Sequence, residues 1–460
     1  MKAFQSELLF TGREWIPKGI ILVEGDEIKE VRKTLPSGFP RQNLVSLTNR
    51  LVIPGGVNSH SHAFQILIRG KADQAQNFRD WVDRYLYPLV LWADEEALYA
   101  GALLAFGEMI QNGITTVGEF YYIHNEKDSF RPLGNRLDEI AIQAATDIGL
   151  RICLLRTLYT SDKKEGQKRF SESLRDCEEN SRALFEKYKD HPLVSVLPAP
   201  HSLHGASEEA IQLGARLAEE WDGKFHIHLA EEKHDLVYSQ EVYQTTPLRA
   251  LEKMGVLNDR LVIVHGCHLD PEEIAMLGSA GGGLAYNPIS NMALGDGISP
   301  IEEYIRQGVR ISLGTDGACA NNQENLFAEA KAAEHLQRVS QLRMNVIPKA
   351  YQEQNKPYGL FQMATLHGGE NLCLPVGLLE GGYKADFIAL NLDDLSLLPD
   401  FSMDGQTLLN NVIFSMSVRS AITDSVVGGE FVLRNGRLVR MPEKEIVQRV
   451  RNIVSKWNLE

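Results

Sequence analysis

The chain has 460 residues and a formal net charge of −14, with 43% of its residues hydrophobic and 23% charged. This composition is that of a folded globular protein with a large core, and it excludes an intrinsically disordered chain. The acidic balance also argues against a nucleic-acid or anionic-membrane surface, because either partner requires a basic patch.

The N-terminal segment "MKAFQSELLFTGREW" has no long apolar stretch, so we do not expect a signal peptide. No run of about 18 apolar residues occurs, so no membrane span is expected either. The five cysteines are scattered and lack C-x-x-C spacing. This usage predicts free thiols and a cytoplasmic protein.

The two ends of the chain are predicted to be β-rich. Residues 19–31 alternate apolar and polar side chains about a Gly-Asp turn, and residues 425–441 do so about an Asn-Gly turn. Both patterns are typical of β-hairpins. We therefore expect the ends to pair in one small sheet domain, with an amphipathic helix after Pro442.

Between these ends, short apolar runs alternate with longer helical patterns such as residues 94–113 and 207–221. The eight runs are residues 50–60, 114–120, 150–156, 193–200, 224–231, 260–268, 282–288 and 309–316. This rhythm predicts an α/β fold, and eight strands separated by helices favour a (β/α)8 TIM barrel over an open doubly wound sheet.

Polar residues close several of these runs. They are His60, His62, His228, Glu231, His265 and Asp316. The C-terminal strand ends of such a barrel form its active-site face, so we expect these side chains to lie together.

His60 and His62 form an H-x-H pair straight after a Pro-Gly-Gly turn. Alternate strand residues point the same way, so the pair is either a metal chelate or two side chains sharing one face. "HIH" at 226–228 repeats the pattern. We favour His228 as the ligand, because it lies nearer the strand end, and assign His226 a structural role.

The remaining groups each have two interpretations. Glu231 is placed to shuttle protons, whereas Glu232 is better explained as a solvated loop acid. Asp316 is either a helix N-cap or a metal ligand and base. His265 alone is more typical of a satisfied core histidine. We interpret three further histidines as structural, namely His234, His268 and His335.

Three histidines and one carboxylate would hold one divalent ion with a position left for water. The ion would lower the pKa of that water to about 7, making hydroxide available. A nearby Glu and Asp could take its proton and pass it to a leaving nitrogen.

The motifs "PGGVNSHSH", "HLAE", "VHGCH", "YNPISNMALGDGISP" and "LGTDGA" together resemble the metal-dependent amidohydrolase superfamily, in its aminohydrolase and chlorohydrolase branch. The resemblance covers nearly the whole chain, and "VGLLEGGYKADFIAL" (376–390) resembles the family's return into a small β domain. It implies a composite β-sandwich domain from residues 1–52 and 376–442, a catalytic barrel over 53–375 and a C-terminal helix over 443–460.

The resemblance also implies roles for individual residues. His60, His62, His228 and Asp316 would ligate one ion, Zn²⁺ or Fe²⁺, with Asp316 also acting as base. Glu231 would protonate the substrate nitrogen, and His265 would orient the nucleophile. No lysine lies at a strand end suited to bridging two ions, so one ion is expected.

For the substrate, the chain resembles two subgroups. "NSHSHAFQ", "NFRDWV" and "GEFYYIHN" are similar to the formimidoylglutamate deiminases, which implies substrate contacts by Gln65, Tyr122 and His201. The two arginines that clamp carboxylates in that subgroup are matched here by Val82 and His204. "GTDGACANNQENLF" instead resembles heterocycle deaminases and triazine hydrolases.

These observations predict a hydrolase that releases ammonia from an amidine-like small molecule or an amino-substituted heterocycle. One alternative is displacement of chloride or an alkylamine from a triazine-like ring. Another is a catalytically silent scaffold, although the sequence contains all four predicted metal ligands. The H-x-E and P-C-x-x-C arrangement of polynucleotide deaminases is absent, and the resemblance implies a homodimer.

Overall fold

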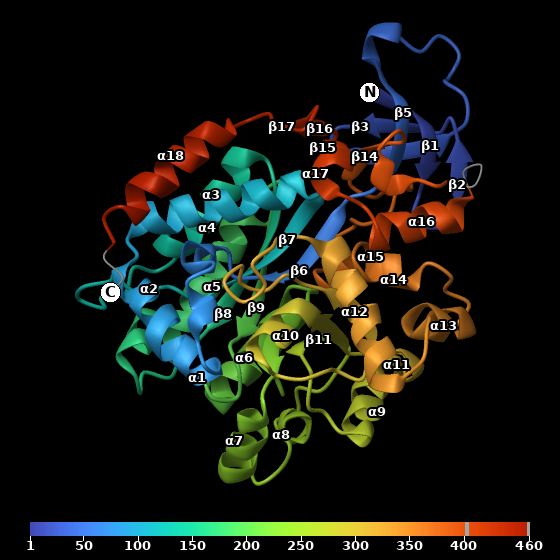
Figure 1. Cartoon of the computed structure of the whole chain (residues 1–460). Helices are drawn as coiled ribbons and strands as arrows, with labels where there is room; N and C mark the ends of the chain where they lie inside the picture. Colours follow the sequence, from blue (N-terminus) through green and yellow to red (C-terminus); the bar gives the residue numbers. More distant parts are fainter. Residues whose placement is uncertain (401–403, 458–460) are drawn as a thin grey trace.

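The computed structural model of the chain describes residues 1–400 and 404–457 (Figure 1). Within these residues the strands form three sheets, two with four strands each and one with nine. The four-stranded sheets are parallel, and their strands alternate with helices along the chain. The chain therefore has the predicted α/β architecture.

Each of the eight apolar runs overlaps one strand of the parallel sheets, and β6, β7 and β8 extend one or two residues beyond their runs. The first sheet is formed in order by β6 (Gly56–Ser61), β7 (Ile114–Tyr121), β8 (Arg151–Leu158) and β9 (Val194–Pro200). The second is formed in order by β10 (Phe225–Leu229), β11 (Leu261–His265), β12 (Gly283–Tyr286) and β13 (Arg310–Leu313). Isolated parallel β-bridges join the two sheets, one between Ser202 and His228 and the other between Ser61 and Asp316.

The first run, predicted as one strand over residues 50–60, is divided between two sheets. Its beginning belongs to β5 (Leu44–Pro54) in the nine-stranded sheet, and β6 starts afresh at Gly56. The chain changes sheets at Gly55, where an added Cβ atom would lie 2.1 Å from Oγ1 of Thr115. Only glycine fits this close approach.

Both ends of the chain contribute to the nine-stranded sheet (Figure 1). Besides β5, its strands are β1 (Lys2–Phe10), β2 (Trp15–Pro17), β3 (Ile20–Glu24), β4 (Glu27–Arg32), β14 (Phe387–Asn391), β15 (Ile422–Val427), β16 (Glu430–Arg434) and β17 (Arg437–Leu438). Strands β5 and β14 pair antiparallel and so join the two ends. The hairpin predicted over 19–31 is β3–β4, and the segment 425–441 holds β16, β17 and the end of β15.

The α-helices are α1 (Phe78–Trp81), α2 (Tyr87–Trp92), α3 (Glu95–Gln111), α4 (Arg136–Ile148), α5 (Leu174–Tyr188), α6 (Glu208–Glu220), α7 (Lys233–Tyr243), α8 (Pro247–Lys253), α9 (Pro271–Ser279), α10 (Pro288–Leu294), α11 (Ile301–Arg306), α12 (Leu326–Gln341), α13 (Val346–Glu353), α14 (Gly359–Met363), α15 (Leu366–Asn371), α16 (Gly405–Phe414), α17 (Val418–Ala421) and α18 (Glu443–Val454). The predicted helices 94–113 and 207–221 correspond to α3 and α6. The helix expected after Pro442 is α18, which packs against α3 (Figure 1). The helix was expected to extend to residue 460, but residues 458–460 lie outside the described part of the chain.

A buried ionic network stabilises the segment that follows β8. Nη2 of Arg156 donates to Oε1 of Glu172 at 2.9 Å, and both side chains are almost fully buried. Nδ1 of His124 lies 3.1 Å from Oδ2 of Asp138 in the same cluster. The backbone N–H of Glu172 donates to the carbonyl of Tyr159, so the network holds this segment against the sheet.

The five cysteines are free thiols, as predicted. Among the helices that the structure describes, none combines the length and apolar character needed to cross a membrane.

Candidate metal centre and active site

The predicted functional side chains lie at the C-terminal ends of the parallel strands. His60 belongs to β6 and His228 to β10, and His265 is the last residue of β11. Asp316 follows β13, and Glu231 follows β10. Parallel strands thus bring together residues that are distant in the sequence.

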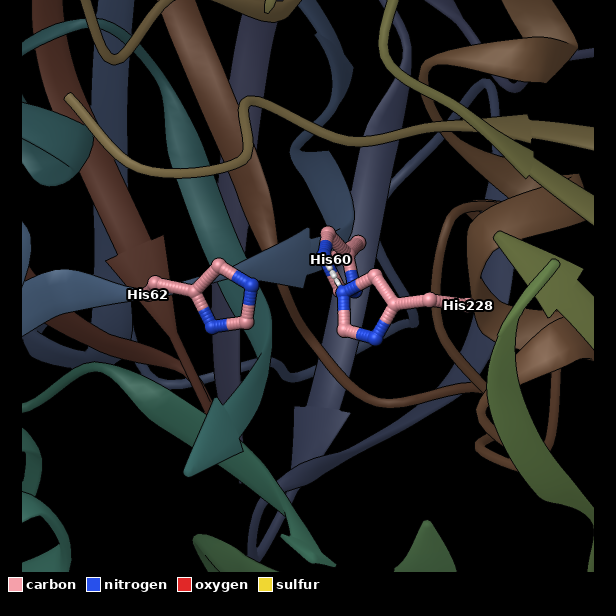
Figure 2. A group of neighbouring side chains, drawn as sticks. All are labelled: His60, His62 and His228. Carbon is pink, nitrogen blue, oxygen red and sulfur yellow. Dashed lines mark hydrogen bonds between the residues drawn. The ribbon is translucent and has the colours of Figure 1, made fainter. Parts of the chain in front are cut away.

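Three of the histidines point toward one another, namely His60, His62 and His228 (Figure 2). One ring nitrogen of each lies within 4.8 Å of the others. Nε2 of His60 is 3.3 Å from Nε2 of His228. Oδ1 of Asp316 is 3.5 Å from Nε2 of His60 and 3.4 Å from Nε2 of His62.

The outer nitrogens of two of these rings set their tautomers. Nδ1 of His62 donates to the carbonyl oxygen of Phe120 at 2.7 Å, and Nδ1 of His228 donates to that of His201 at 2.9 Å. A carbonyl only accepts, so each Nε2 carries a lone pair directed inward. Lone pairs that converge beside a carboxylate repel one another without a cation. The donor set therefore fits a divalent metal ion.

The ionisation states agree with this donor set. Burial lowers the pKa of His60 to about 3 and also lowers the pKa values of His62 and His228. These imidazoles are neutral at neutral pH, as metal ligands must be. For Asp316, burial acts to raise the pKa, but the contact with Nε2 of His60 and the positive charge that the neighbouring imidazoles carry when protonated outweigh burial and lower it.

Asp316 is held in a constrained position. Oγ of Ser290 donates to its Oδ2 at 2.5 Å. Its backbone φ is +56°, and that of His265 is +72°, both in the left-handed region that non-glycine residues rarely adopt. Such conformations cluster at functional sites, where the surrounding structure enforces them.

A second group joins Glu231, His265 and Asp316, whose ligand atoms also lie within 4.8 Å of one another. Nε2 of His265 is 3.4 Å from Oε1 of Glu231. Nδ1 of His265 accepts from Nδ2 of Asn291 at 2.9 Å, so its proton resides on Nε2, toward Glu231. Burial, followed by the charges of Asp296 and Asp316, raises the pKa of Glu231 well above its ordinary value.

Three neighbours of this site received no role from the sequence, namely Ser290, Asn291 and Asp296. Ser290 and Asn291 lie in α10, and Nδ2 of Asn291 also donates to Oδ2 of Asp296 at 3.0 Å. Burial raises the pKa of Asp296 to about 8. All three residues lie in the segment "YNPISNMALGDG", and this motif is the feature of the sequence that could have identified them.

The two groups open onto a cavity of about 490 Å³. Its walls include every predicted site residue except His60: His62, Gln65, Tyr122, His201, His204, His228, Glu231, His265 and Asp316. Val82 also lines it, together with the aromatic side chains Phe78, Trp81, Tyr87, Tyr159, Phe170 and Tyr238.

The predicted substrate contacts have defined partners within this wall. Nε2 of Gln65 donates to the hydroxyl of Tyr122 at 2.7 Å, and Sγ of Cys319 donates to Oε1 of Gln65 at 3.2 Å. Nδ1 of His204 lies 3.6 Å from Oδ1 of Asp235. Gln65 is therefore held in one orientation at the cavity wall.

Four histidines interpreted as structural differ in their surroundings. Nε2 of His226 donates to the carbonyl of Asn371 at 2.9 Å, and Nε2 of His268 donates to that of Asp296 at 2.8 Å. His335 stacks on a phenylalanine at the surface. His234 instead lines the cavity.

Comparison with known proteins relates nearly the whole chain to one protein family. The sequence matches the Amidohydrolase family over residues 51–432. It is 30% identical over 446 residues to the 5-methylthioadenosine/S-adenosylhomocysteine deaminase of Pyrococcus abyssi, covering 96% of each chain. It is 31% identical over 447 residues to the 5'-deoxyadenosine deaminase of Methanothermobacter thermautotrophicus, again covering 96% of each.

Two solved structures share the fold at lower identity. The atrazine chlorohydrolase of Arthrobacter aurescens complexed with zinc has a TM-score of 0.87 at 24% identity, covering 99% of this chain and 100% of the other. The adenosine deaminase of Xanthomonas campestris with bound zinc has a TM-score of 0.84 at 22% identity, covering 99% and 98%.

Proposed function

The chain belongs to the amidohydrolase family, and from this we propose that it is a zinc-dependent deaminase of amino-substituted, purine-like heterocycles. As a family member it is a hydrolase that acts on carbon–nitrogen bonds. Deaminases of adenosine derivatives align over nearly the whole chain, and this similarity supports a heterocyclic substrate. The aromatic cavity wall also favours a planar ring over a linear formimino group.

The metal ligands in this proposal are His60, His62, His228 and Asp316, with zinc preferred and Fe²⁺ as the alternative ion. When bound, the ion would supply Lewis acidity and make water at the site easier to deprotonate. Asp316 would take a proton from the attacking water. Glu231 would deliver a proton to the ring nitrogen beside the attacked carbon, and His265 would orient the attacking oxygen through its Nε2–H.

The reaction adds water across the amidine carbon, breaks its bond to the exocyclic nitrogen and releases ammonia. A ring carbonyl is left in the product. Gln65, Tyr122, His201 and His204 would contact the substrate, since all four line the cavity. The observation that carries the proposal is the convergence of four potential ligands in the cavity that also contains Glu231 and His265.

The test is ammonia release from metal-loaded protein. The panel should contain 5'-deoxyadenosine, 5'-methylthioadenosine, S-adenosylhomocysteine, guanine and formimidoylglutamate. We expect turnover of at least one adenine nucleoside and none of formimidoylglutamate. A fully metal-loaded protein that releases ammonia from none of the purines would contradict the proposal.

A second candidate is displacement of chloride or an alkylamine from a triazine-like ring. It is favoured by the fold shared with the atrazine chlorohydrolase. The same metal centre would serve both reactions, because only the leaving group differs. Chloride and amine release from chlorotriazines, measured beside ammonia release, separates the two candidates.

We also propose that the eight parallel strands close into a (β/α)8 barrel, which the bridges at both sheet edges support. Residues 53–375 would form this catalytic barrel. Residues 1–52 and 376–442 would form a composite β-sandwich domain, and residues 443–460 the C-terminal helix. The chain is further proposed to be a cytoplasmic homodimer, which light scattering and cell fractionation would test.

A further inference from the structure

Two cationic side chains line the wall of this cavity without a partner among the described residues. Arg79, in α1, and Lys163, before the 3-10 helix η5 (Glu165–Arg169), both line the cavity that contains the proposed metal centre. Neither side chain makes a hydrogen bond or ion pair within the part of the chain that the structure describes, and both are exposed. The adjacent Lys164 instead pairs with Asp83 at 2.7 Å.

A continuous series of aromatic contacts connects the proposed metal ligands with η5. The ring of His62 lies 5.1 Å from that of Tyr122, and Tyr122 lies 4.8 Å from Phe170. Phe170 lies 5.4 Å from Tyr159. The hydroxyl of Tyr159 accepts from Nε2 of Gln167 at 3.0 Å, within η5. The wall therefore runs from the metal centre to the segment that carries the free lysine.

Two carboxylates at the start of α7, Glu232 and Asp235, also line the cavity, and among the described residues neither pairs with Arg79 or Lys163. Asp235 has a partner of its own in His204 and also accepts from the backbone N–H groups of Glu231 and Glu232. Cations that line a cavity attract an anionic ligand and orient it.

We infer that Arg79 and Lys163 form a subsite for a carboxylate or phosphate group that the substrate carries at the end away from its amino group. This inference rests on the proposed deaminase function and narrows its substrate class. The heterocycle would lie along the aromatic wall with its amino group toward the metal centre. Its charged substituent would then extend toward η5 and α1.

Arg79 lies close in the chain to Val82, which also lines the cavity. Arg79 precedes Val82 by three residues in a continuous helical segment, so the two side chains lie on neighbouring positions of one face. The guanidinium of Arg79 is therefore available one turn before Val82 in the cavity wall. Its planar fork suits either a carboxylate or a phosphate.

The experiment compares substrates that differ at the distal group. S-adenosylhomocysteine and 5'-methylthioadenosine form the carboxylate pair, and adenosine 5'-monophosphate and adenosine form the phosphate pair. S-adenosylhomocysteine is a zwitterion, so the anionic member of each pair means the one that bears the distal carboxylate or phosphate. We expect the zinc-loaded enzyme to prefer the anionic member of at least one pair in kcat/KM. The pair that shows the preference identifies the anion.

The variants are Arg79→Gln, Lys163→Gln and the double variant, with Lys168→Gln as the matched control. Lys168 is an exposed lysine of η5 whose ammonium lies over the Phe130 ring, and it does not line the cavity. The double variant should lower kcat/KM for the preferred anionic substrate about tenfold or more, the effect of losing one charge-assisted contact. It should leave the neutral member and the zinc content unchanged.

Salt gives an independent readout. Raising the ionic strength should increase KM for the anionic substrate in the unaltered enzyme and not in the double variant. Equal kcat/KM for both members of each pair, or an anionic preference that survives in the double variant, overturns the inference. If no purine releases ammonia, the proposed function fails. The anion subsite is then tested by measuring how tightly the two members of each pair bind to the zinc-loaded protein. Equal binding of both members, or no binding of either, overturns the inference.

Discussion

The backbone N–H of Asp316 donates to the carbonyl oxygen of His60 at 3.0 Å. This bond belongs to the β-bridge between Ser61 and Asp316, which joins the first and last strands of the two parallel sheets. Two proposed metal ligands that are far apart in the sequence are thus held by the same contact that joins the sheets. The geometry of the metal centre therefore depends on the packing of the fold as a whole.

Metal binding should depend on the histidines described above. His60→Ala and His228→Ala should each reduce bound zinc from about one ion per chain to a small fraction, because each removes one ligand. Both should abolish ammonia release, and removing zinc from the unaltered protein should lower its Tm. Metal content is measured by elemental analysis, with His335→Ala as the exposed control. Full zinc occupancy in both ligand variants would show that the ion binds elsewhere.

Glu231→Gln tests the proposed proton donor without changing the shape of the side chain. Loss of a general acid should reduce kcat by a factor of about 10²–10⁴. Zinc content and Tm should stay at the values of the unaltered enzyme. Glu232→Gln, one residue along, is the control and should change kcat only slightly. Unchanged turnover in Glu231→Gln would remove Glu231 from the mechanism.

The strands and the converging histidines could be predicted because both follow from local patterns. Apolar runs identify the strands, and H-x-H at a strand end directs both rings to the same face. The rule that strand ends share one face then groups His60 with His228 and Asp316. The division of the first run at Gly55 was not predictable in this way, since apolar residues continue across it. Only the close approach of Thr115 reveals it.

The contacts that orient the proposed catalytic groups could not be predicted either. Asn291 reaches His265, and Ser290 reaches Asp316, only because α10 docks over the ends of β11 and β13. Nothing in the spacing of these residues specifies that docking. The position of Arg79 and Lys163 at the cavity wall, without a partner in residues 1–400 and 404–457, likewise depends on what the folded chain places near them.

Ser290→Ala tests whether Asp316 needs its hydroxyl partner. The variant loses the 2.5 Å hydrogen bond to Oδ2 of Asp316. A hydrogen bond to a charged group contributes about 1.5–3 kcal/mol, so we expect kcat/KM to fall about tenfold or more. Zinc should still bind at saturating concentration, and Ser290→Thr should restore part of the rate. The exposed Ser340→Ala is the control, and an unaltered rate in Ser290→Ala would contradict a positioning role.

The buried pair of Arg156 and Glu172 should make stability depend on pH. Burial acts to raise the pKa of Glu172, but the charge of Arg156 outweighs it and the pKa lies below the ordinary 4.5. Such a carboxylate stabilises the fold above its unfolded-state pKa, and this contribution disappears as the pH falls through the lowered value. Glu172→Gln should therefore lower Tm clearly at about pH 7, and the gap to the unaltered protein should narrow toward about pH 4. Scanning calorimetry of both proteins, with the exposed Glu179→Gln as control, measures this gap. A gap that stays constant with pH would mean that the charge of Glu172 does not contribute to stability.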